Sequence, residues 1–207
     1  MKWEKKLELL SYIAFDLQLI HSYDIIHCDL HNGNIFQNDL HNAYIVDLGI
    51  AKSVNKTLDK ESGGIYGALS YIAPEVILGK QLTKASDIYS FGMIMWEISS
   101  GNVVFSDYKD DDSNLAREIC FNESRPNILK GTATCYVNLL KKCWDKDPEK
   151  RPSAIEIHEI ILKWKNTPEI LSEFLKSDKE MMIKNNDFNN IEDSMIYTTN
   201  FIRNIIQ

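Results

Sequence analysis

The sequence predicts a mainly α-helical fold that carries a few short β-hairpins. Apolar residues recur at helical spacing in three segments, near residues 10–20, 86–99 and 153–165. The β-prone runs are only two to four residues long, and all of them lie between residues 25 and 46. The chain has 207 residues, of which 44% are hydrophobic and 26% charged, and this composition suits one sizeable core.

The opening segment is expected to form an amphipathic helix. Its apolar positions lie three or four residues apart, at Leu10, Ile13, Ala14, Leu17 and Ile20. Short strands are expected next at residues 25–26, 34–36 and 43–46, and the polar residues 38–42 suit a hairpin turn. Residues 52–70 are rich in Ser, Gly, Lys and Thr and predict a long loop, a feature that is usually functional or disordered.

The second half of the chain predicts helices followed by a tail. Residues 86–99 are apolar on every face, which is typical of a buried helix. Further helices are expected at residues 113–121, 133–144 and 153–165. After Pro168 the composition shifts toward Asn, Asp, Lys and Met without periodicity. We therefore expect one domain over residues 1–165 and a partly helical or disordered tail over residues 166–207.

Charge and cysteine content narrow the partners and the compartment. The formal net charge is −7, and this acidic balance argues against nucleic acid or an anionic membrane surface as the main partner. No apolar run approaches the length that spans a bilayer, so no membrane insertion is expected. The 4 cysteines form no C-x-x-C pair, a pattern typical of free thiols in a reducing compartment. A cytoplasmic location is the default expectation.

One stretch carries residues suited to phosphoryl transfer. It reads His27-Cys28-Asp29-Leu30-His31-Asn32-Gly33-Asn34, and Asp47-Leu48-Gly49 follows after the expected hairpin. Phosphoryl transfer needs a carboxylate to orient the attacking hydroxyl, and hard oxygen ligands to hold Mg²⁺ against the nucleotide phosphates. The hairpin brings Asn34 and Asp47 together as candidate magnesium ligands, and Asp29 can accept the hydroxyl proton.

These two segments resemble the catalytic loop and the D-F-G metal motif of protein kinases, H-R-D-L-x-x-x-N and D-F-G. Small-molecule kinases of the aminoglycoside and choline type use a similar H-x-D-L-H-x-x-N loop followed by a metal-binding Asp. His31 makes this loop resemble theirs somewhat more closely. The catalytic loop alone therefore leaves both classes open.

Three downstream motifs favour protein kinases. Ala73-Pro74-Glu75 resembles the A-P-E close of an activation segment, and residues 87–92 resemble the D-x-W-S-F-G start of the central helix. Residues 143–152 resemble the C-W-x-x-D-P-x-x-R-P segment near the end of the domain. All of these motifs occur in family order over roughly residues 5–165. The last motif resembles the tyrosine-kinase-like and tyrosine-kinase branches, and the whole span resembles the C-terminal lobe of the kinase domain.

The resemblance implies roles at the cleft, with ATP and Mg²⁺ as cofactors and a protein substrate or regulatory partner. Asp29 matches the residue that orients the acceptor hydroxyl, and His31 stands at a position near the transferring phosphate. Asn34 and Asp47 match the metal ligands that hold the nucleotide. Phe36 matches the residue that floors the adenine.

Four further residues match structural positions of the family. His27 matches a packing residue of the catalytic loop. Glu75 and Arg151 match an ion pair that ties the activation segment to the late helices. Asp87 matches the helix residue that hydrogen-bonds to the backbone of the catalytic loop.

The sequence also departs from the family pattern. Cys28 stands where most kinases have an Arg that pairs with a phosphorylated activation loop, so switching through this position is not expected. His31 replaces a Lys, and Ala68 stands where serine/threonine kinases usually have Thr. The G-x-G-x-x-G loop and the V-A-I-K lysine do not occur, which indicates that the N-terminal lobe is missing.

Two functions follow as hypotheses. The first is a protein kinase that transfers phosphate to a protein hydroxyl, Ser or Thr ahead of Tyr, with the isolated chain inactive because it lacks the N-terminal lobe. The second is a pseudokinase-like module that binds protein partners in signalling without catalysis. The intact Asp29, Asn34 and Asp47 favour the first hypothesis.

Overall fold

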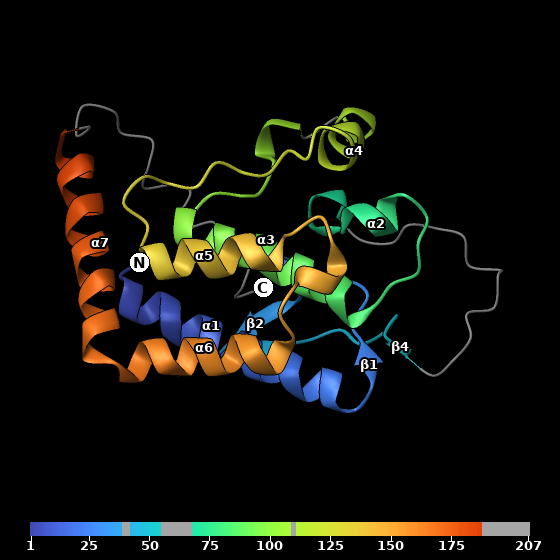
Figure 1. The fold of residues 1–207 in the computed structure, drawn as a ribbon, viewed down its shortest axis with the longest axis horizontal. Coiled ribbons are helices and arrows are strands. Elements are labelled where there is room, and N and C mark those ends of the chain that lie inside the picture. The colour runs from blue at the N-terminus through green and yellow to red at the C-terminus, as the bar shows by residue number, and fades with distance from the viewer. Residues whose placement is uncertain (39–41, 55–67, 109–110, 188–207) are drawn as a thin grey trace.

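The computed structural model describes residues 1–38, 42–54, 68–108 and 111–187, with side chains described as far as residue 180. The described chain is mostly helical, with two small antiparallel sheets, so the predicted fold class is confirmed. Figure 1 shows most of the helices running roughly along the long axis of the molecule, with the last described helix upright at one end. No helix in these ranges is long and apolar enough to cross a membrane.

The first helix and the two sheets form the part of the lobe that carries the candidate site. The predicted opening helix is α1 (Trp3–Ser22), and it buries its apolar stripe. The predicted hairpin is confirmed as β2 (Ile35–Gln37) paired antiparallel with β3 (Ala43–Ile45). Residues 39–41 of the expected turn lie outside the described residues, whereas the Asn38 N–H donates to Asn42 O across it at 3.0 Å.

The second sheet corrects one expectation. Residues 52–70 were expected to form a loop throughout, whereas β4 (Lys52–Ser53) pairs antiparallel with β1 (Ile25–Ile26). A strand of two residues has no periodicity to reveal it, because its hydrogen bonds come from a partner far away in the sequence. Residues 55–67 lie outside the described residues, and a single 3₁₀ turn over Leu69–Tyr71 follows them.

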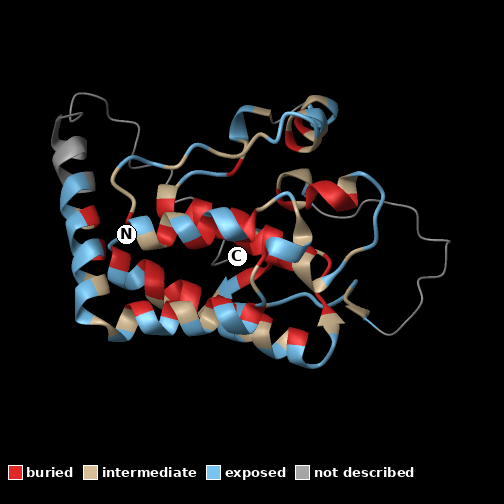
Figure 2. Cartoon of the chain, viewed as in Figure 1, coloured by how far each residue is buried: buried red, intermediate tan, exposed pale blue. Residues whose placement is uncertain are grey.

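The centre of the lobe is α3 (Lys84–Ser100), which confirms the predicted buried helix. Every residue from Ser86 to Ser99 is buried (red in Figure 2), as expected for a helix that is apolar on all faces. The Ser86 Oγ accepts from the Thr83 N–H at 2.7 Å, and this bond caps the first turn. Gly101, with a φ of 75°, ends the helix in the left-handed conformation that favours glycine.

The other helices surround α3. The predicted helices are confirmed as α4 (Asp112–Cys120), α5 (Thr134–Cys143) and α6 (Ala154–Asn166). The short α2 (Pro74–Ile77) was not predicted, because a single turn is too short to show helical periodicity. In Figure 1, α1 and α6 lie side by side in one layer, while α3 and α5 form the next. Two further 3₁₀ turns span Ser106–Tyr108 and Pro148–Lys150.

The last described helix, α7 (Pro168–Asp187), packs against the beginning of α1. Phe174 is 2% exposed, and its ring lies 5.1 Å from that of Trp3. The Trp3 N–H donates to Asp178 Oδ1 at 3.0 Å, and the Trp3 indole N–H donates to Ser177 Oγ at 2.7 Å. The Asp178 carboxylate therefore lies at the N-terminus of α1, where a negative charge is favourable. Residues 188–207 lie outside the described residues.

Candidate active site

The loop that carries Asp29 lies between β1 and β2, and its backbone is hydrogen-bonded to Asp87 of α3. The carboxylate of Asp87, 2% exposed, accepts from the His27 N–H at 2.8 Å and from the Cys28 N–H at 3.1 Å. Its Oδ2 also lies 2.8 Å from His21 Nε2 on α1. One buried carboxylate thus satisfies two backbone donors of the loop and links it to two helices.

His21 was missed in the sequence analysis. It is 7% exposed and lies on the buried stripe of α1, seven residues after Ala14 and four after Leu17. A histidine on an otherwise apolar stripe needs a hydrogen-bond partner when it is buried, and this was the available signal. The partner itself, Asp87, lies 66 residues away in the chain.

Cys28 takes an unusual backbone conformation at the start of the loop. Its φ is +72°, in the left-handed region that a residue with a side chain adopts at a cost. The bond from its N–H to Asp87 helps to hold that conformation. Burial, and secondarily the Asp87 charge, raises the pKa of the Cys28 thiol to about 11. The thiol is therefore protonated at neutral pH and is a poor nucleophile.

His27 joins the loop to the end of β3. Its side chain is fully buried, and its Nε2 donates to Val46 O at 3.1 Å. Its Nδ1 accepts from the Asp29 N–H at 3.3 Å. The imidazole therefore bridges the backbone N–H of Asp29 and the carbonyl of Val46, the residue before Asp47.

Asn34 holds the carboxyl end of the loop against Asp29. Its side-chain Nδ2 donates to Asp29 O at 2.8 Å and lies 3.4 Å from Asp29 Oδ2. Because the amide nitrogen bonds to Asp29, the amide oxygen is the atom of Asn34 that could bind a cation. Asn34 is 8% exposed, whereas Asp29 is half-buried and therefore partly accessible to solvent.

Asp47 lies at the same end of the hairpin as Asn34, on the neighbouring chain segment after β3. The Val46 N–H donates to Asn34 O at 2.9 Å, so the two candidate ligands emerge from paired chain ends. Asp47 is exposed, has a φ of +64°, and accepts from the Gly49 N–H through Oδ1 at 3.1 Å. A Cβ on residue 49 would lie 2.9 Å from that oxygen, so Gly49 allows the close approach.

The donor atoms fit a magnesium ion better than a transition metal. Asn34 and Asp47 offer hard oxygen atoms, and Mg²⁺ is usually held by one or two carboxylates together with substrate phosphates. Among the described residues, no group of three or more His, Cys, Asp or Glu side chains could hold a metal by itself. A cation at this hairpin would therefore need oxygen ligands from a bound nucleotide as well.

Phe36 lies on the outer face of the hairpin, opposite Tyr44 on β3. Both rings are about half exposed, Phe36 at 47% and Tyr44 at 42%, and Leu48 beside Asp47 is also 49% exposed. The apolar side chains next to the candidate ligands Asn34 and Asp47 are therefore partly open to solvent among the described residues.

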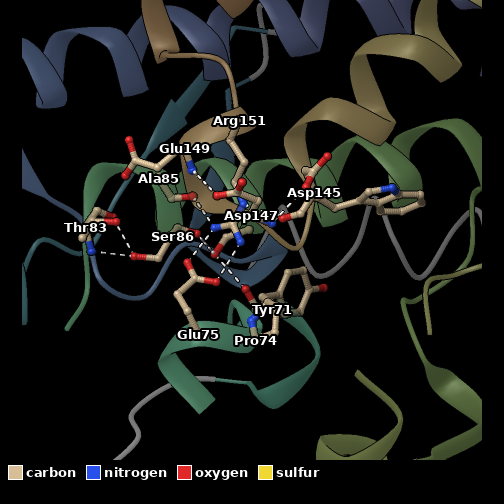
Figure 3. Close-up of polar contacts among 12 residues, drawn as sticks. Tyr71, Pro74, Glu75, Thr83, Ala85, Ser86, Asp145, Asp147, Glu149 and Arg151 are labelled. Atoms are coloured by element: carbon tan, nitrogen blue, oxygen red, sulfur yellow. Dashed lines mark hydrogen bonds and ion pairs between the residues drawn. The ribbon is translucent and has the colours of Figure 1, made fainter. Parts of the chain in front are cut away.

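Glu75 and Arg151 form a buried bidentate ion pair (Figure 3). Arg151 Nη1 and Nη2 each lie 2.7 Å from one oxygen of the Glu75 carboxylate. Arg151 also donates to Ala85 O at 2.9 Å and to Asp145 O at 2.8 Å. The pair joins α2 to the start of α3 and to the turn before α6.

A second buried carboxyl, Glu97, was also missed in the sequence analysis. It belongs to α3, is fully buried, and accepts from the Tyr71 hydroxyl at 2.7 Å and from the Val104 N–H at 2.9 Å. Burial raises the pKa of Glu97 to about 7, against the opposing effect of these two hydrogen bonds.

The titration of Glu97 predicts a pH-dependent stability. The folded protein keeps this proton up to a pH of about 7, whereas the ordinary pKa of Glu, 4.5, applies in the unfolded chain. Because the folded state binds more protons in this window, its free energy of unfolding falls as the pH rises through it. We expect the loss of stability over this pH range to be about 3 kcal/mol, because one pKa unit corresponds to about 1.4 kcal/mol.

Urea unfolding at several pH values from about 4.5 to about 8 should show this contribution. Other groups titrate in the same range, so the quantity to compare is the difference between the wild type and Glu97→Gln. The Gln side chain keeps an acceptor for Tyr71 but cannot ionise. We expect the variant to lose less stability with rising pH, and equal slopes for the two proteins would contradict the assignment.

The helical architecture and the Asp29–Asn34–Asp47 arrangement together define the class of fold, a protein-kinase-like helical lobe. Comparison with known sequences agrees, since the model of the family "Protein tyrosine and serine/threonine kinase" matches residues 1–161. The chain belongs to this protein kinase family.

Individual relatives have names that agree with the family. The Serine/threonine/tyrosine-protein kinase HT1 of Arabidopsis thaliana is 29% identical over 161 residues, which cover 78% of this chain and 40% of that protein. The Dual specificity protein kinase shkC of Dictyostelium discoideum is 33% identical over 134 residues, 64% of this chain and 26% of that protein. The Probable serine/threonine-protein kinase roco5 of the same organism is 31% identical, and the match covers 77% of this chain and 6% of that protein. The chain thus spans less than half the length of each of these relatives.

Proposed function

We propose that this chain is the C-terminal lobe of a protein kinase that transfers phosphate from ATP to a hydroxyl group of a protein. The observation that carries the proposal is the meeting of Asp29, Asn34 and Asp47 at one end of the β2–β3 hairpin. The Asp29 carboxylate orients the attacking hydroxyl and accepts its proton. Asn34 and Asp47 would hold Mg²⁺, which neutralises charge on the nucleotide phosphates when it is bound.

We further propose that the acceptor is Ser or Thr ahead of Tyr, and that the chain belongs to the tyrosine-kinase-like or tyrosine-kinase branch. The C-W-x-x-D-P-x-x-R-P segment at residues 143–152 supports the branch. The names of the relatives include serine/threonine, dual-specificity and serine/threonine/tyrosine kinases, which supports a hydroxyl preference that is not restricted to Tyr.

The isolated chain is proposed to be nearly inactive. Phe36, Tyr44 and Leu48 leave the apolar face of the cleft uncovered in the described residues, so the adenine and phosphates would meet one wall only. Positioning supplies most of the catalysis in phosphoryl transfer, and a half-formed cleft cannot provide it.

Phosphate transfer should be measured with magnesium and ATP on a generic protein substrate, using the 207-residue chain and a fusion that places the N-terminal lobe of a related kinase before it. We expect the isolated chain to match its Asp47→Ala variant. The fusion should be active, and Asp29→Asn should lower its rate by at least about 100-fold. Activity of the isolated chain above that of Asp47→Ala would disprove the proposed inactivity, and a fusion insensitive to Asp29→Asn would disprove the role of Asp29.

A second function, a pseudokinase-like module that binds partners without catalysis, has one specific observation in its favour. Cys28 replaces the Arg that would pair with a phosphorylated loop, and its protonated thiol cannot act as that partner. If the fusion bound magnesium–ATP, measured by a shift in its melting temperature, yet transferred no phosphate, the binding-module function would replace the catalytic one.

A further inference from the structure

The imidazole of His31 is held in one orientation by the loop that carries it. His31 precedes the 3₁₀ turn Asn32–Asn34, and its Nδ1 accepts from the Gly33 N–H at 3.0 Å. A neutral imidazole carries its proton on one nitrogen only. Because Nδ1 accepts a hydrogen bond, the proton of the neutral ring belongs on Nε2.

Gly33 makes this pose possible because it has no side chain. A Cβ built on residue 33 would lie 2.7 Å from His31 Cε1 and 2.9 Å from His31 Nδ1. These separations are shorter than carbon–carbon and carbon–nitrogen contacts allow. Any other residue at position 33 would therefore push the imidazole away from the backbone N–H that it binds.

Tyr71 packs against the same imidazole from the end of the activation segment. Its ring centroid lies 5.9 Å from that of His31, with the planes inclined by 51°. Tyr71 is 6% exposed, and Ser90 Oγ donates to its carbonyl oxygen at 2.8 Å. Its hydroxyl donates to the buried Glu97 at 2.7 Å. The ring is therefore fixed at its backbone and at its tip by two residues of α3.

The remaining nitrogen of His31 faces Asp29. Its Nε2 lies 3.6 Å from Asp29 Oδ2, and the Asn34 amide approaches the same oxygen at 3.4 Å. The Asn34 amide thus contacts Oδ2, and the His31 Nε2 lies just beyond hydrogen-bond distance of the same oxygen.

We propose that Gly33, Tyr71 and Glu97 are positioning residues that hold His31 as the Nε2–H tautomer, with that N–H directed at Asp29. The functional consequence, an Asp29 carboxylate oriented for the acceptor hydroxyl, rests on the proposed function above. The orientation of His31 does not depend on catalysis and can be measured separately. Sequence alone could not identify Glu97, because its contact with Tyr71 joins residues that are 26 positions apart.

The test is heteronuclear NMR on the 207-residue chain labelled with ¹⁵N. Long-range ¹H–¹⁵N correlations distinguish the protonated from the unprotonated imidazole nitrogen, and spectra at a pH of about 8 keep an ordinary histidine neutral. The chain has 5 histidines, so the His31 signals are assigned by their loss in His31→Gln. In the wild type we expect one tautomer, with the proton on Nε2.

Three variants should shift His31 toward a mixture of tautomers: Gly33→Ala, Tyr71→Phe and Glu97→Leu, the last of which has no acceptor for the Tyr71 hydroxyl. The matched control is Tyr136→Phe, which removes a buried hydroxyl that donates to Met95 O at 2.6 Å instead. We expect this control to leave the His31 signals unchanged. The conservative change Tyr71→Phe keeps the test decisive if Gly33→Ala or Glu97→Leu does not fold.

The proposal is overturned if wild-type His31 shows the Nδ1–H tautomer or the averaged signals of a free imidazole. It is also overturned if none of the three variants differs from the Tyr136→Phe control. In the active fusion, Gly33→Ala should lower kcat by about tenfold with the KM for ATP unchanged. If the fusion shows a single Nε2–H tautomer but transfers no phosphate, the proposed function alone is disproved. If the fusion is active but His31 averages freely between tautomers, only this inference is disproved.

Discussion

Replacing Arg151 by alanine is expected to lower the free energy of unfolding by about 3–5 kcal/mol, because the change leaves the Glu75 carboxylate buried without its partner. The Arg151 side chain is fully buried in the ion pair, and Glu75 is only 7% exposed. Two further backbone acceptors, Ala85 O and Asp145 O, lose their guanidinium donor at the same time.

The guanidinium of Arg151 also packs on an aromatic ring. It lies 5.2 Å from the ring centroid of Tyr89, and Arg125 lies 5.2 Å from the same centroid. The alanine variant loses this contact as well, which adds to the cost of truncation. Because α2 is a single turn, we expect it to depend on the pair for its position relative to the turn before α6.

Urea unfolding of Arg151→Ala is best compared with Lys146→Ala, which removes an ion pair with Glu123 at the surface. The side chains of that pair are 65% and 55% exposed, so its loss should leave the free energy of unfolding nearly unchanged. The double change Glu75→Ala with Arg151→Ala should cost less than the sum of the single changes, because no unpaired charge is left buried. If Arg151→Ala were as mild as Lys146→Ala, the pair would have no structural importance.

The second large effect is expected at Asp87. Replacing it by alanine should lower the free energy of unfolding by about 3–5 kcal/mol, because the buried N–H groups of His27 and Cys28 and the ring of His21 all lose their acceptor. The loop would also lose the contact that holds Cys28 at its positive φ.

Asp87→Asn separates these contributions. An amide offers one oxygen in place of two, so it can replace only part of the bonding, and we expect a loss between that of alanine and that of the wild type. The exposed Asp107→Ala is the control and should be nearly neutral. Amide hydrogen exchange at His27 and Cys28 gives a local measurement, since both amides should exchange faster in Asp87→Ala. Unchanged protection at these two amides would contradict the assigned role of Asp87.

Much of the helical architecture could be predicted from the sequence. The stripe from Leu10 to Ile20 and the uniformly apolar segment from Ser86 to Ser99 became α1 and α3, because helical periodicity records which face is buried. The β2–β3 hairpin was predicted because its strands are neighbours in the chain. β4 and α2 were missed, because elements of two and four residues have no periodicity of their own.

The residues of the candidate site were likewise only partly predictable from the sequence. Asp29, His31 and Asn34 lie within one contiguous loop, and residue types at fixed spacing are enough to single them out. His21 and Glu97 lie on helices whose pattern indicates only burial. Their partners come from distant segments, 66 residues away for His21 and 26 for Glu97, and no local pattern records which polar groups will meet.

The sequence by itself determined the helical faces, the hairpin and the spacing of the candidate site residues in the loop, because each of these depends on neighbours along the chain. Only the tertiary structure decided which further residues support that loop: His21 beside Asp87, and Tyr71 with Glu97 beside His31. The physical reason is that a buried polar group must find a hydrogen-bond partner wherever packing places one, and packing is a property of the folded chain.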